Sequence, residues 1–99
     1  MTEQEAITRT NEAIEAIKKD VQKDVIKDYA LPPLVNMQTG RTTGHAVEMQ
    51  VSTKYDYGEV VMTEWKEKLG ADSWNIRVRR NQLWLRFFIH YDEKKEDNV

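Results

Sequence analysis

The chain has 99 residues, of which 39% are hydrophobic and 32% charged, and its formal net charge is -2. This length allows one domain, and the composition is too apolar and too aromatic for a disordered protein. The lack of cysteine excludes disulfides, a thiolate metal site and a cysteine nucleophile. No apolar run approaches the roughly 18 residues of a membrane span, and the polar, acidic N-terminus does not resemble a secretory signal. We therefore expect a soluble, cytoplasmic protein without a cofactor.

The first predicted element is a long helix over residues 3–29. Its apolar stripe repeats every seven positions, at Ile7, Ile14 and Val21. The pair Pro32-Pro33 ends it, because proline lacks the backbone N–H and disfavours helix in the residue before it. Such a narrow stripe packs on a sheet or pairs with another helix. Dimerisation of the protein through this helix is therefore one alternative for its role.

A strand, a turn and a longer strand are predicted next. Residues 34–38 form a short strand, and residues 39–44 form a turn because they include two glycines and three threonines. Residues 45–53 alternate between apolar and polar side chains, which is typical of a half-buried strand.

A second helix is predicted over residues 56–69. Asp56 and Glu59 have the spacing of a capping box at its start, and Gly70 suits a left-handed residue at its end. The buried stripe consists of Val61, Trp65 and Leu69, with Met62 beside it.

The alternation over residues 74–91 predicts a β-hairpin. A two-residue loop at Asn81-Gln82 places the apolar residues of both strands on one inner face. The pairs expected from this loop are Val78 with Leu85, Ile76 with Phe87 and Arg77 with Arg86, whereas a four-residue loop keeps the same faces but changes these partners.

These elements predict an α+β domain over residues 1–91. A long N-terminal helix precedes an antiparallel sheet of three or four strands, a second helix lies between strands, and the C-terminal strands form a hairpin. Both helices are expected on one face of the sheet. The charged tail, residues 92–99, is expected to be frayed.

The outer face of the hairpin is the candidate binding site. Residues 73–91 contain four arginines and no acid. Arginine and tryptophan dominate the hot spots of protein interfaces, and arginines between aromatic rings also suit single-stranded nucleic acid. Opposed like charges at Arg77 and Arg86 would favour an anionic partner. The residues expected to bind a partner are Arg77, Arg79, Trp84, Arg86 and Phe88.

A purely structural role for this face is the alternative. The first helix would then cover it, and Trp84 and Phe88 would belong to the core. Arg79 would stack on Trp84 in a cation–π contact, and Glu48 of the neighbouring strand would pair with Arg77 or Arg86.

No constellation of catalytic or metal-binding residues is recognisable. The two histidines, His45 and His90, have no second ligand at a diagnostic spacing, and the acids are spread along the chain. We expect no enzymatic activity, no metal and no membrane partner. The expected function is that of a module that acts by occupying a partner macromolecule, most likely a protein. By size and composition the chain is like small inhibitors from phages and mobile elements, so one version blocks a host nucleic-acid enzyme. Direct binding of single-stranded nucleic acid is the alternative.

Overall fold

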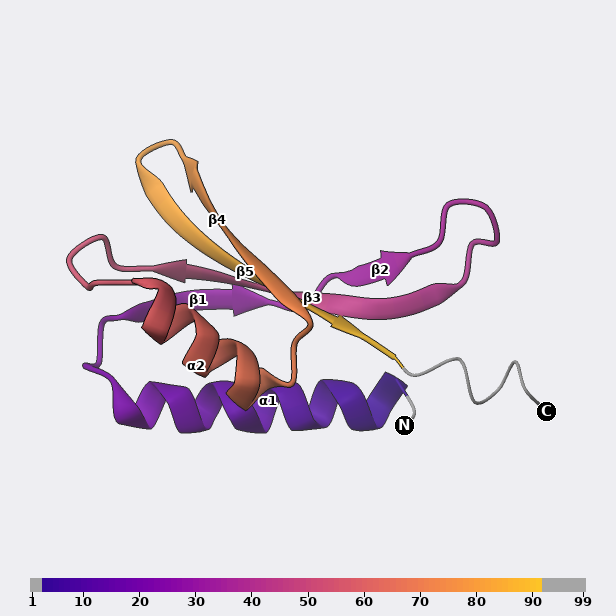
Figure 1. Ribbon diagram of the computed structural model, residues 1–99, viewed down its shortest axis with the longest axis horizontal. Coiled ribbons are helices and arrows are strands. Elements are labelled where there is room, and N and C mark those ends of the chain that lie inside the picture. The colour runs from indigo at the N-terminus through magenta and orange to yellow at the C-terminus, as the bar shows by residue number, and fades with distance from the viewer. Residues whose placement is uncertain (1–2, 92–99) are drawn as a thin grey trace.

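The structure, a computed structural model, describes residues 3–91 and contains two helices and a five-stranded antiparallel sheet (Figure 1). The predicted α+β class, with a second helix between strands and a C-terminal hairpin, is confirmed. The sheet has one strand more than the predicted maximum. The elements in chain order are α1 Glu3–Asp20, β1 Ile26–Ala30, β2 Pro33–Val35, β3 Thr42–Val51, α2 Glu59–Leu69, β4 Ser73–Arg79 and β5 Gln82–His90.

The long strand β3 lies at the centre of the sheet. On one side it pairs with β5, and on the other side β1 and β2 pair with successive parts of it. The hairpin partner β4 lies outside β5, so the order across the sheet is β1-β3-β5-β4. All of these pairings are antiparallel.

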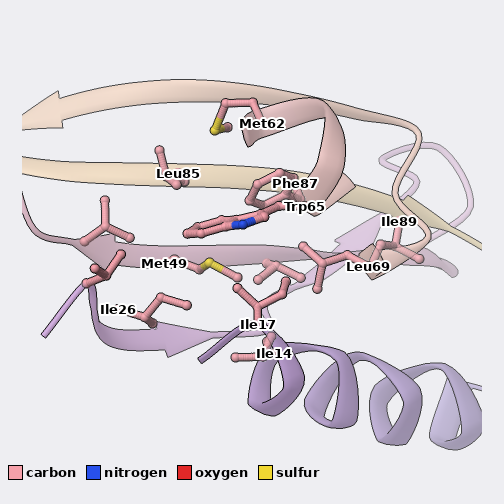
Figure 2. Packing of buried hydrophobic residues seen from close by; sticks show 13 residues of the cluster. Ile14, Ile17, Ile26, Met49, Met62, Trp65, Leu69, Leu85, Phe87 and Ile89 are labelled. Carbon is pink, nitrogen blue, oxygen red and sulfur yellow. The ribbon is translucent and has the colours of Figure 1, made fainter. Parts of the chain in front are cut away.

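The core lies between one face of the sheet and the two helices, which lie side by side beneath it (Figure 1). Figure 2 shows Trp65 of α2 and Ile17 of α1 directed toward sheet residues such as Phe87. Removing these side chains from water is the main stabilising contribution. Neither of the two described helices has the length and apolar composition needed to cross a membrane.

The predicted long helix is wrong in its C-terminal third, because α1 ends at Asp20 and residues 26–30 form β1. Val25 and Ile26 are adjacent and both buried, and Ile26 pairs with Val51 of β3. Hydrogen bonding to the open side of β3 therefore outweighs local helix propensity, as tertiary contacts often do. β-branched residues and the nearby Pro32-Pro33 also favour extended backbone here.

Two further boundaries differ from the predictions. The predicted turn at 39–44 is wrong in its second half, because β3 begins at Thr42 and includes Gly44. In α2 the predicted capping box is wrong, because the helix begins after Gly58, which makes no side-chain cap. Its end is confirmed: Gly70 is left-handed, with φ 71°.

The hairpin loop is Arg80-Asn81 and not Asn81-Gln82. Both loop residues have positive φ, 51° and 64°, which is the type I′ geometry that matches the twist of paired strands. Asparagine thereby takes the second loop position. This one-residue shift keeps the two predicted faces but replaces every predicted pair: Val78 lies opposite Leu83, Ile76 opposite Leu85, and Trp74 opposite Phe87.

Candidate binding surface

The face of the sheet opposite the helices is open, and it carries all five residues predicted to bind a partner. We call it the outer face and define it by Arg77, Arg79, Trp84, Arg86 and Phe88. The first helix does not cover it, because α1 packs its buried residues into the core on the other side of the sheet (Figure 1). Arg77 and Arg79 are exposed, and the other three side chains are half-buried.

The strand register corrects one predicted pair. Arg77 lies opposite Trp84, and Arg86 lies opposite Asn75 on one side and Glu48 on the other. The two arginines are therefore not opposed, and their repulsion does not support an anionic partner. The predicted ion pair between Glu48 and Arg86 is present, with 3.1 Å between Nε and Oε2.

Two of the five side chains already contact each other. The Arg86 guanidinium lies 5.1 Å from the centre of the Phe88 ring, a cation–π distance. The cation–π pair on this face therefore joins Arg86 to Phe88, and not Arg79 to Trp84 as predicted. One side of the Phe88 ring is occupied by this contact.

A small hollow in the outer face brings four of the predicted residues together around Glu48. About 70 Å³ of space lies between the side chains of Glu48, Arg77, Arg79, Trp84 and Arg86. Three arginines and one glutamate thus line the same hollow, and of the three only Arg86 lies within ion-pair distance of Glu48. Within residues 3–91, the side chains of Arg77 and Arg79 have no ion pair or hydrogen-bond partner.

Two buried donors in the lining of this hollow are also unsatisfied. Neither the Trp84 Nε1–H nor the Arg86 Nε–H has a hydrogen-bond partner in the described chain. The Arg86 nitrogen lies close to Glu48, but its N–H does not point at the carboxylate oxygen. A buried donor without a partner costs roughly 1–3 kcal/mol. Unpaired donors beside free cations form a surface suited to an anionic oxygen.

Sequence reasoning missed the exposure of the hairpin's inner face. The alternation predicts Ile76 and Val78 to be buried, yet they are 42% and 71% exposed. The tip of the hairpin rises away from both helices, so no helix covers these two side chains (Figure 1). No signal in the sequence reports how far the helices extend beneath the hairpin.

Both histidines have partners within the chain: exposed His90 has its Nδ1 2.7 Å from Asp72 Oδ2, and His45 is buried. His45 is 1% exposed, and its Nε2 lies 2.9 Å from the Thr10 hydroxyl oxygen. Thr10 donates its own proton to the Ala6 carbonyl, so Nε2 of His45 donates and Nδ1 accepts from Tyr91 Oη at 3.0 Å. No cluster of potential metal ligands occurs among residues 3–91.

His45 makes stability depend on pH. Burial lowers the pKa of His45, and the charge of Glu3 raises it by less. His45 therefore binds a proton more readily in the unfolded chain than in the folded one. Above about pH 6.5 His45 does not lower the free energy of unfolding, and as the pH drops below that value its protonation increasingly favours the unfolded chain. Urea unfolding is accordingly expected to give a lower free energy of unfolding at pH 5.5 than at pH 7.5.

The matched variants for this measurement are His45→Gln and His90→Gln. His45→Gln is expected to lose the part of the pH dependence of the free energy of unfolding that His45 causes, and His90→Gln is expected to keep it. Equal pH dependence in wild type and His45→Gln would show that burial of His45 does not control it.

No protein-family model matches this chain, and comparison with curated proteins and with solved structures found no match. The function is therefore argued from the surface itself.

Proposed function

We propose that this protein is a small non-enzymatic module that binds an acidic surface of another protein through its outer face. The hollow that Glu48 lines carries the proposal, because it combines the two unpaired guanidinium groups of Arg77 and Arg79 with the buried Trp84 Nε1–H, which has no hydrogen-bond partner in the described chain, on an uncovered face. Partner carboxylates would give charge-assisted hydrogen bonds, which are roughly twice as strong as neutral ones.

Several features favour protein over single-stranded nucleic acid as the partner. A stacking platform needs free ring faces, but Arg86 lies over the Phe88 ring and Trp84 is half-buried. The net charge of -2 also lacks the basic excess of dedicated nucleic-acid binders.

Assembly through α1 is less well supported. Ile14 and Ile17 are 0% exposed within a single chain, so this part of the apolar stripe is already used in the core. A helix pair through that stripe would have to pull these side chains away from the sheet.

Fluorescence anisotropy with a short labelled peptide of alternating Glu and Ser tests the proposal. Arg77→Ala/Arg79→Ala is expected to weaken binding about tenfold, equivalent to about 1.4 kcal/mol. The matched control, Lys18→Ala/Lys19→Ala, removes the same charge from α1 on the far side of the sheet and is expected to bind like wild type.

The same titration with labelled mixed-sequence single-stranded DNA separates the two partner classes. If the protein binds DNA more tightly than the peptide, and the arginine variant loses this DNA binding, the partner is a nucleic acid and not a protein. Equal loss in the arginine and lysine variants, or no peptide binding at low salt, would overturn the proposal.

A further inference from the structure

The strand β4 is an edge strand of the sheet that has neither a bulge nor a proline. Its seven residues pair with β5 in one unbroken register from Ser73 to Arg79. The other side of the sheet is less regular: β1 contains a bulge at Lys27, the pairing of β2 with β3 shifts register at Leu34 and Val35, and β2 begins with Pro33. Bulges and proline discourage the addition of another strand, and β4 has neither.

The register shows which backbone groups of β4 are free. In a two-residue type I′ hairpin, the residues that flank the loop exchange both hydrogen bonds. Arg79 and Gln82 flank this loop, so Arg79, Arg77 and Asn75 bond to β5. The N–H and C=O groups of Val78, Ile76 and Trp74 therefore point away from β5, where no further strand pairs with them in the described chain.

The side chains of this edge differ in character on the two faces. On the outer face, Arg77 and Arg79 are exposed and unpaired within residues 3–91. On the inner face, Ile76 and Val78 are 42% and 71% exposed. An added strand would therefore meet cations on one face and aliphatic side chains on the other.

From this arrangement we infer that the partner binds by adding an extended segment to the edge of β4. The segment alternates acidic residues, which lie over Arg77 and Arg79, with aliphatic residues, which cover Ile76 and Val78. Backbone hydrogen bonds to Ile76 and Val78 hold the segment, and alternate side chains give specificity. This inference rests on the proposed function and specifies the form of its partner.

Charge favours such an acidic strand over a second copy of β4. Pairing β4 with itself would bring two arginines from each chain, Arg77 and Arg79, onto one face of the new pair. Like charges on neighbouring strands destabilise a sheet.

Amide hydrogen exchange followed by NMR tests the added strand, with a peptide of alternating Glu and Val as the probe. In the free protein the Ile76 and Val78 amides are expected to exchange quickly. Saturating peptide is expected to slow them at least about tenfold. The same peptide N-methylated on every valine, the residues placed opposite Ile76 and Val78, cannot form these backbone pairs; it is the matched control and is expected to give no protection.

A variant supplies a second readout of the same inference. Ile76→Pro removes an N–H that β5 does not use, so an edge position tolerates it better than a ladder position. It is expected to abolish peptide binding, whereas Ile76→Thr keeps the N–H and is expected to retain binding. The methylated peptide tests the inference on the wild-type protein if Ile76→Pro fails to fold.

Each outcome of these experiments has a definite meaning. Binding that depends on Arg77 and Arg79 without protection of Ile76 and Val78 overturns the added strand but leaves the proposed function standing. Absence of any binding overturns both. If these amides are protected in the free protein, and the protection increases with protein concentration, the strand added to β4 is a second copy of the chain and not an acidic partner segment.

Discussion

Ile14→Ala is expected to lower the free energy of unfolding by about 2–5 kcal/mol. Ile14 is 0% exposed and belongs to the core cluster between α1 and the sheet (Figure 2). The substitution removes contacts and leaves a cavity that a close-packed interior fills only in part. Because a domain of this size has only about 5–15 kcal/mol of stability, the melting temperature is expected to fall by roughly 10–30 °C.

Ile7→Ala is the matched control, since Ile7 lies one heptad earlier on the same predicted stripe. Ile7 is only half-buried, so its truncation is expected to cost less than half as much. Urea unfolding followed by circular dichroism measures both variants, and sedimentation measures their association state. An Ile14→Ala protein that is as stable as wild type but loses a dimer would show that the stripe joins two chains.

Gly44→Ala is expected to destabilise the protein by about 3 kcal/mol or more, since overpacking against a rigid neighbour is among the costliest changes. A Cβ atom at Gly44 would overlap the Ile89 carbonyl oxygen and lie 2.9 Å from the His90 Cα. Both atoms belong to the backbone of β5, so relief requires the two central strands to separate. The strain would also reach the neighbouring His45 and its hydrogen bonds.

Gly58→Ala provides the comparison. A Cβ atom there would have Asp56 Oδ1 as its nearest neighbour at 3.7 Å, an ordinary contact, and φ is -68°. We expect a change within about 1 kcal/mol, because a small loss at the N-cap is offset by reduced freedom of the unfolded chain. Thermal unfolding of both variants checks the contrast, and similar melting temperatures would mean that β5 yields easily at Gly44.

The candidate site could be predicted from the sequence to the extent that it depends on alternation. Side chains in a strand alternate strictly between faces, so Arg77, Arg79, Trp84, Arg86 and Phe88 share one face in any register that keeps the hydrophobic set together. The partners across the strands depend on the loop, and a loop shifted by one residue changed all of them. The prediction that Arg77 opposes Arg86 was wrong for this reason.

The two glycines Gly70 and Gly44 illustrate the same division. Gly70 was predicted correctly as a helix end, because the need for positive φ is a local property. Gly44 was placed in a turn, but its role is the close approach of β5, a segment far away in the chain. Composition around Gly44 carries no information about that neighbour.

Local patterns in the chain are sufficient to predict the α+β class, the second helix with its left-handed end, and the alternation that gathers arginine and aromatic residues on one side of the hairpin. These follow from local geometry: the period of a helix or strand and the backbone preferences of glycine and proline. The end of α1 at Asp20, the open outer face and the free edge of β4 become visible only in the folded chain. Those features depend on which distant segment forms hydrogen bonds with β3 and on how much of the sheet the helices cover. Both are set by packing between residues far apart in the chain.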